Sequence, residues 1–168
     1  MTYVIEGNVI KYEERNINTD LIIPARYLNK SDAHHLAAHC MEDLDPKFHE
    51  KKKELNASIL VAGANFGSGS SREQAPVALK AAGIKCIIAP SYARIFFRNS
   101  INIALPLIEF SEIDELHTAD KLQIDLEGGS LVNNTTGKNY SIPKMPQFLQ
   151  ELLAEEGLIN FGKKMLHQ

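Results

Sequence analysis

Short apolar runs alternate with helical patterns through the middle of the chain. Strand-length runs rich in β-branched residues occupy 57–63, 85–89 and 105–110, and apolar residues recur at helical spacing over 72–83 and 91–102. Gly83 is placed to end the first of these helices, and Ser91 is placed to cap the second. Strands and helices in this order predict parallel βαβ units with right-handed crossovers.

The N-terminal flank predicts a strand and a helix. Residues 3–12 alternate apolar and polar side chains around Gly7-Asn8, which is typical of a strand or of a small hairpin. Ser31-Asp32 can cap a helix that runs on to residue 44.

The C-terminal part has a different pattern. Alternating runs joined by Gly-Gly and Thr-Gly turns over 121–144 predict antiparallel hairpins. An amphipathic helix is expected over about 146–157, followed by a tail. We therefore expect one α/β domain over 1–168, in which helices flank a small parallel sheet that carries an antiparallel β layer.

Composition narrows the function classes. The chain has 168 residues with a net charge of −3, so it lacks the basic surface of a nucleic-acid-binding protein. No run approaches the roughly 18 apolar residues of a membrane span, and residues 1–12 lack a secretory apolar region. The two cysteines, Cys40 and Cys86, are too few for a disulfide framework, which favours a reduced, cytoplasmic protein.

The stretch GSGSSRE at 67–73 lies between a predicted strand and helix, where α/β proteins bind ligands. It does not match the familiar templates. A Walker A loop would need Lys after its last glycine, a dinucleotide fingerprint fails at Arg72, and a nucleophile elbow fails at Glu73.

Two readings of this stretch remain compatible. Ser70 and Glu73 have the spacing of a helix capping box, which contributes roughly 1 kcal/mol. That reading leaves Arg72 unexplained, because a cation in the first helical turn opposes the helix dipole. Gly67 and Gly69 allow close backbone approach, and an arginine fork beside them favours a carboxylate ligand. The same positive field would stabilise a Ser70 alkoxide and make it a base without a histidine.

Two other groups of charged residues carry weaker signals. His35 and His39 stand one helical turn apart with Glu42 nearby, but no fourth ligand accompanies them, so we predict no metal site. Arg94 and Arg98 share a helix face, where a salt bridge or a contact with a partner is the simpler reading.

Residues 63–109 resemble the swivel domain of the aconitase superfamily, through GANFGSGSSRE and the segment that follows. With NTDLIIPARYL at 18–28 upstream, the chain is similar to the small subunits of 3-isopropylmalate dehydratases from about residue 5 to about residue 160. The resemblance implies a swivelling β/β/α domain. It also implies a large-subunit partner, in a heterodimer or heterotetramer, that carries a [4Fe–4S] cluster, with no cofactor on this chain.

The implied reaction interconverts 2-isopropylmalate and 3-isopropylmalate by dehydration and rehydration in leucine biosynthesis. By position, Ser70 corresponds to the family's catalytic base, and Ser71 and Arg72 to residues that bind the substrate carboxylate. Gln74 replaces a histidine that many relatives carry, and we assign it no role.

The resemblance also implies a substrate-specificity loop and residues that support the site. The loop comprises Tyr27, Leu28, Asn29 and Lys30, and the supporting residues are Thr19, Asp20 and Arg94. Asn29 and Lys30 are more polar than the pair associated with some isopropylmalate enzymes. A homoaconitase-like or dimethylmalate-type hydro-lyase subunit therefore remains an alternative, as does a non-catalytic carboxylate-binding module of this fold.

Overall fold

A computed structural model describes residues 3–166, with the side chains of all but 158–161. The chain forms one seven-stranded sheet in the order β4-β3-β2-β1-β5-β6-β7. The parallel strands are β1 (Val4–Tyr12), β2 (Ala57–Ala62), β3 (Cys86–Ala89) and β4 (Leu107–Glu109). The antiparallel strands are β5 (Lys121–Asp125), β6 (Ser130–Asn133) and β7 (Lys138–Ser141). The predicted α/β fold with an antiparallel β layer is confirmed.

The helices include the two that were predicted between the parallel strands. They are α1 (Thr19–Ile22), α2 (Ala33–Ala38), α3 (Phe48–Leu55), α4 (Gln74–Ala81), α5 (Arg94–Asn102), α6 (Gln147–Ala154) and α7 (Leu158–Leu166), with 3-10 turns η1 (Ala25–Tyr27) and η2 (Ile113–Glu115). As predicted, Gly83 follows the end of α4 with φ +98°, and the N–H of Ile84 closes the helix on the Leu79 carbonyl.

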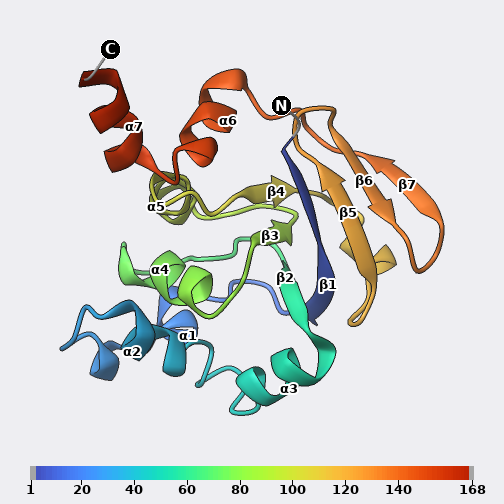
Figure 1. The fold of residues 1–168 in the computed structure, drawn as a ribbon. Helices are drawn as coiled ribbons and strands as arrows, with labels where there is room; N and C mark the ends of the chain where they lie inside the picture. Colours follow the sequence, from blue (N-terminus) through green and yellow to red (C-terminus); the bar gives the residue numbers. More distant parts are fainter. Residues whose placement is uncertain (1–2, 167–168) are drawn as a thin grey trace.

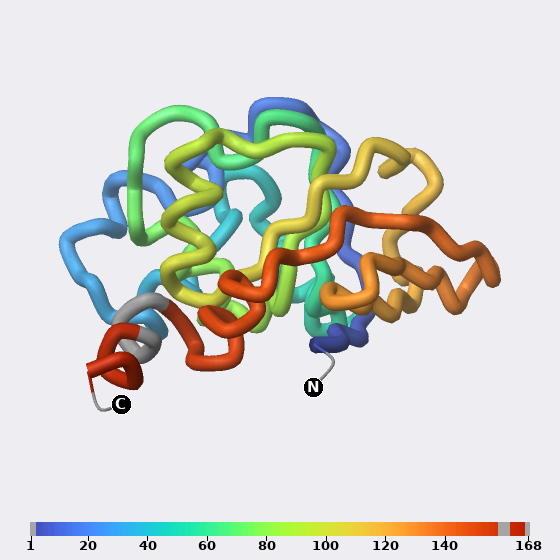
Figure 2. Tube along the Cα trace, turned by 90° about the horizontal axis from the view of Figure 1, so that it is seen from above, coloured from blue at the N-terminus to red at the C-terminus, as the bar shows by residue number. Residues whose placement is uncertain are grey.

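The two faces of the sheet bury different cores. Leu60 and Ala62 of β2 face the helices, while Ile59 and Val61 face the other way. The second core is covered by β5, β6 and η2 as the sheet curls over itself. Seen from above, the helices lie on one side of the central strands and the antiparallel hairpins on the other (Figure 2). Parallel strands buried on both faces explain why the middle of the sequence shows continuous apolar runs.

Strand β1 is continuous, so the hairpin alternative around Gly7-Asn8 is wrong (Figure 1). A Cβ at Gly7 would collide with the Ser58 hydroxyl on the neighbouring strand, so glycine is needed for close packing and makes no turn. The pairing with β2 shifts register between Asn8 and Val9, where the Asn8 amide donates to the Leu55 carbonyl at 2.9 Å.

Two predicted helices have different limits in the structure. Asp32 caps α2 as expected, but the helix ends at Ala38 and not at residue 44. The chain turns at Met41, with φ +63°, so that the Met41 N–H reaches the Ile22 carbonyl. The expected C-terminal helix corresponds to α6, and the segment expected as a tail forms α7.

The end of β1 is attached to α3 through Asp45. Tyr12 Oη donates to this carboxylate at 2.7 Å, and Lys51 Nζ lies 2.9 Å from it. Burial alone would raise the pKa of Asp45, but the hydrogen bonds from Tyr12 and Lys51 outweigh burial and hold the pKa below its usual value. This contact fixes the strand end from which the chain leaves towards the loops described below.

Within residues 3–166 no helix has both the length and the apolar composition needed to cross a bilayer.

Candidate active site

The loops that follow β1, β2 and β3 meet at the carboxyl edge of the parallel strands (Figure 2). The Gly67 N–H donates to the Ile17 carbonyl at 2.8 Å, and the Thr19 N–H donates to the Ser68 carbonyl at 2.9 Å. The third loop joins through the Ala93 N–H, which donates to the Phe66 carbonyl at 3.0 Å. Backbone pairing therefore fixes the GSGSSRE stretch between two other loops, so it is not a flexible connection.

The two glycines of this stretch are required by its backbone. Gly67 and Gly69 have φ +82° and +93°, which side-chain-bearing residues rarely adopt. A Cβ at Gly67 would also collide with the ring of Phe96. The alternation of glycine and serine therefore encodes the path of the loop.

The predicted capping box of Ser70 and Glu73 is wrong. Helix α4 begins at Gln74, and its N-cap residue Glu73 makes no side-chain cap bond. Pro76 explains the late start, because proline is tolerated in the first helical turn but would break a helix that began at Ser70. Arg72 consequently lies before the helix and not in its first turn, where the capping-box prediction had placed it.

Ser91 also has a different role from the predicted cap. Helix α5 begins at Arg94 with Ala93 as N-cap residue and no side-chain cap bond. The Ser91 hydroxyl instead accepts the N–H of Asn65 at 2.9 Å. It thereby connects the loops that follow β2 and β3.

A hollow of about 190 Å³, with several polar side chains in its lining, opens among these loops. We call it the Ser70 hollow; its lining comprises Thr19, Gly67, Gly69, Ser70, Ser71, Arg72, Ala93, Arg94, Ile95, Phe96 and Asn99. Five predicted site residues from three separate segments are thus brought together: Thr19, Ser70, Ser71, Arg72 and Arg94. The hollow is smaller than a typical ligand pocket of about 300–1,000 Å³, as half of a site would be.

Ser70 and Thr19 form a pair of hydroxyl groups at this hollow. Thr19 is only 2% exposed, and its Oγ1 donates to the Ser70 carbonyl at 3.0 Å. The two hydroxyl oxygens lie 3.2 Å apart. Since Thr19 has a single proton and gives it to the carbonyl, the Ser70 hydroxyl donates to Thr19 in this arrangement.

Arg72 is held from two sides. Its Nη1 donates to the Ile23 carbonyl at 3.0 Å and pairs with Asp20 at 2.5 Å. The Arg72 side chain is 16% exposed, whereas that of Asp20 is 65% exposed. Within residues 3–166 the guanidinium makes no other hydrogen bond, so the edge formed by Nε and Nη2 stays available for a carboxylate.

Three further polar side chains line the hollow without a hydrogen-bond partner among the described residues: Ser71, Arg94 and Asn99. The sequence reasoning missed Asn99. It stands one helical turn after Ile95, which also lines the hollow, so the signal was the α5 face that carries Ile95 and Asn99. Arg98 shares a turn with Arg94 but does not line the hollow.

The implied specificity loop lies outside the lining of the Ser70 hollow. Tyr27 ends η1 and Leu28 follows it, both half-buried, while Asn29 and Lys30 are exposed. The connection to the hollow runs through Arg72, which binds the carbonyl just before Pro24 and η1.

The chain's own residues do not suit an iron–sulfur cluster. Cys40 and Cys86 are fully buried in the cores on opposite faces of the sheet. Burial raises the pKa of both thiols, that of Cys86 to about 12, whereas cluster ligands are thiolates. No group of three His, Cys, Asp or Glu side chains within residues 3–166 is arranged to hold a metal ion, and the histidine patch is no exception.

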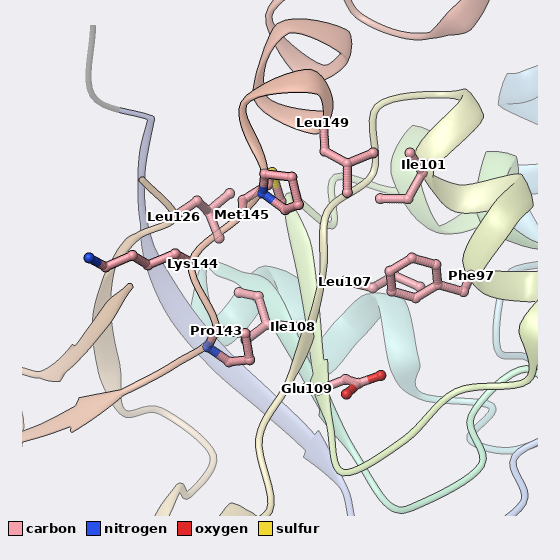
Figure 3. A pocket seen from close by; sticks show the side chains of 11 residues that line it. Phe97, Ile101, Leu107, Ile108, Glu109, Leu126, Pro143, Lys144, Met145 and Leu149 are labelled. Carbon is pink, nitrogen blue, oxygen red and sulfur yellow. The ribbon is translucent and has the colours of Figure 1, made fainter. Parts of the chain in front are cut away.

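A second hollow, of about 130 Å³, lies between α5, β4 and the segment before α6 (Figure 3). Its lining is apolar apart from Glu109 and Lys144, and the Lys144 amino group points away from the Phe97 ring. Because it lacks converging polar groups, it is a gap in packing and offers no chemistry.

Known proteins match both the sequence and this geometry. The family described as the aconitase C-terminal domain matches residues 3–113. The 3-isopropylmalate dehydratase small subunit of Nautilia profundicola is 56% identical over 165 residues, covering 98% of each chain. That of Ruminiclostridium cellulolyticum is 51% identical over 162 residues, covering 96% of this chain and 98% of its own.

A solved structure gives the same result. The 3-isopropylmalate dehydratase structure from Methanocaldococcus jannaschii superposes with a TM-score of 0.89 at 42% identity, covering 97% of this chain and 95% of the other. The expected swivel-domain fold is thereby confirmed. The chain belongs to the aconitase C-terminal domain family and, within it, to the family of 3-isopropylmalate dehydratase small subunits.

Proposed function

We propose that this chain supplies one half of a hydro-lyase active site that interconverts 2-isopropylmalate and 3-isopropylmalate in leucine biosynthesis. The second half belongs to a large subunit, in a heterodimer or heterotetramer. The observation that carries the proposal is the Ser70 hollow, in which a hydroxyl pair and two arginines converge at the carboxyl edge of the sheet. Ser70 and Arg72 are the residues that the family resemblance assigns to proton abstraction and carboxylate binding. The two buried, unpaired cysteines agree with a cytoplasmic enzyme.

Ser70 is the proposed base. The reaction removes a proton from the carbon next to a carboxylate, and the rehydration step returns one. A serine does this only as an alkoxide, which needs nearby positive charge and hydrogen-bond donors. Arg72 and Arg94 provide the charge, and a rotation of the Thr19 hydroxyl would redirect its proton from the Ser70 carbonyl to the Ser70 oxygen.

Arg72, Ser71 and Asn99 are the proposed carboxylate ligands. Asp20 and the Ile23 carbonyl orient the Arg72 side chain through Nη1, which leaves its other edge for a bidentate contact. The Ser71 hydroxyl and the Asn99 amide add neutral donors beside it. Holding both carboxylates fixes the substrate carbon against Ser70 and lowers the entropy cost of the proton transfer.

The large subunit is expected to carry the [4Fe–4S] cluster, which would supply the Lewis acid for the departing hydroxyl group. Cys40 and Cys86 take no part in it, since both are buried far from solvent in the two cores.

Reconstitution tests the proposal. The chain and its large subunit, with an intact cluster, should interconvert the isopropylmalates, while each subunit alone should not. Homoaconitate and dimethylmalate assayed in parallel discriminate the alternatives that the polar Asn29-Lys30 pair leaves open. Turnover of one of these in place of isopropylmalate would move the assignment to that substrate, and no turnover at all would favour a non-catalytic binding module.

A further inference from the structure

A stacked pair of rings brackets the loop over residues 28–31 together with helix α2, which follows that loop. The imidazole of His39 and the phenol ring of Tyr27 are parallel within 5°, with centroids 3.7 Å apart. The Nδ1 of His39 lies 3.2 Å from Glu42 Oε2, which fixes the imidazole plane. Tyr27 is the last residue of η1, and His39 directly follows α2, so the stack joins the end of η1 to the end of α2. The loop over 28–31 lies within the segment that the stack closes.

Arg26 packs on the same tyrosine. Its guanidinium carbon lies 4.7 Å from the Tyr27 centroid. Because His39 covers one face of the ring at contact distance, the guanidinium occupies the other face. Two hydrogen bonds, of 3.0 and 2.5 Å, anchor it to Asp43, and they lower the pKa of that carboxyl.

His35 completes the arrangement. Its Nε2 lies 3.1 Å from the Tyr27 carbonyl, the last backbone acceptor before the loop, and its ring stands edge-on to the Tyr27 ring. We call these residues the Tyr27 clamp: Arg26, Tyr27, His35, His39, Glu42 and Asp43. By contrast, Asn29, Lys30 and Ser31 form no hydrogen bond with another residue of the described chain. The clamp therefore holds the chain before and after these three residues.

We propose that the Tyr27 clamp is a positioning device for substrate selection, with His39 as its key residue. This inference rests on the proposed function and on the specificity role that the family resemblance implies for this loop. The clamp contributes no atom to the Ser70 hollow, so its removal alters which side group is accepted and leaves the proton-transfer residues in place.

The test uses His39→Ala, His39→Phe and, as a matched control in the helix that precedes His39, His34→Ala. His34 is exposed, and its side chain has no partner among the described residues. In the reconstituted enzyme, kcat and KM are measured for 3-isopropylmalate and for the same diacid with a methyl side group. His39→Ala should lower the preference for the isopropyl compound by roughly 2- to 10-fold, the scale of one aromatic pair, chiefly through KM. His39→Phe, which keeps the stack, should restore the preference, and His34→Ala should not change it.

Two results would overturn the inference: an unchanged preference in His39→Ala, or an equal loss of kcat on both compounds. Limited trypsin digestion of the full chain supplies a readout that does not depend on activity. Cleavage after Lys30 should be faster in His39→Ala than in the wild type, His39→Phe or His34→Ala. Equal cleavage rates contradict the clamp, whereas faster cleavage in a chain that turns over no isopropylmalate sustains the clamp and refutes the proposed function alone.

Discussion

Replacing Thr19 by valine separates the support of the Ser70 loop from the chemistry of Ser70. The substitution exchanges a hydroxyl for a methyl group of nearly equal volume at a site that is 2% exposed. It removes the hydrogen bond to the Ser70 carbonyl, but that carbonyl keeps the Arg72 N–H at 2.9 Å as a partner. It also removes the acceptor of the Ser70 hydroxyl, which is exposed and can bond water instead. The free energy of unfolding should therefore fall by only about 1 kcal/mol.

The expected effect on the rate is larger. In the proposed mechanism the Thr19 hydroxyl, 3.2 Å from the Ser70 oxygen, becomes the donor to the alkoxide. A hydrogen bond to a charged group contributes about 1.5–3 kcal/mol, which corresponds to a decrease in kcat of roughly 10- to 150-fold. KM should change little, because the proposed carboxylate ligands are untouched.

Thr19→Ser is the matched control. It retains the hydroxyl and loses a buried methyl group, so it should lower the unfolding free energy by about 1 kcal/mol and keep kcat. Both variants are assayed in the reconstituted enzyme, and their stabilities are compared by urea denaturation. Wild-type kcat in Thr19→Val, or equal losses of kcat in the two variants, would refute the donor role and leave Thr19 as a support of the loop.

Three other substitutions test the remaining contacts. Ser70→Ala should lower kcat by about 10²- to 10⁴-fold, with unchanged thermal unfolding because Ser70 caps no helix. Ser68→Ala, in the same loop, is the control and should stay active. An active Ser70→Ala enzyme would refute the assignment of Ser70 as the base. Arg72→Lys should raise KM about tenfold or more, because lysine lacks the planar fork, and an unchanged KM would contradict the carboxylate role. Asp45→Asn should lower the unfolding free energy at pH 7 by about 2 kcal/mol. Because the folded-state pKa of Asp45 is depressed, this loss of unfolding free energy should be complete above pH of about 4 and should shrink as the pH falls through the folded-state pKa. A loss that stays constant in acid would refute the link between the Asp45 pKa and stability.

Much of the fold could be predicted because its signals are local. The apolar runs that became β2, β3 and β4 are buried on both faces, so their sequences identify them without knowledge of their neighbours. The end of α4 could be predicted because Gly83 adopts a positive φ, a conformation that glycine favours after a helix. The position of GSGSSRE at the carboxyl edge of the sheet followed from the order of the elements alone.

The predictions that failed are those in which a distant contact overrode a local rule. Ser70 and Glu73 have the spacing of a capping box, yet the Ser70 hydroxyl is directed at Thr19, 51 residues away in the chain. Ser91 is a residue type that commonly caps helices, but its hydroxyl accepts the N–H of Asn65, 26 residues away. Short polar side chains bond whichever polar group tertiary structure brings nearest, so spacing rules for them hold only where no other loop is close.

The order of the strands in the sheet determines which residues contact the Arg72 side chain. Because β1 lies beside β2, the segment after β1 is carried along the segment after β2, and Asp20 and Ile23 arrive at the guanidinium. The sequence predicted both strands but not their adjacency. Had the pairing been known, the carboxyl ends of two neighbouring parallel strands would have placed Thr19 and Asp20 against GSGSSRE. Asn99 would have followed from the α5 face that carries Ile95.

The unpaired donors of the Ser70 hollow indicate the chemistry of what covers it. Ser71, Arg94 and Asn99 have no partner among the described residues, which is tolerable while water reaches them. Ser70 itself is exposed, and an exposed serine is not basic enough to remove a carbon-bound proton. Catalysis therefore requires a cover that excludes water, and once water is excluded each unpaired donor costs about 1–3 kcal/mol unless it meets an acceptor. A substrate with two carboxylates brings acceptors for all three, so closure by the partner and binding of a diacid stabilise each other.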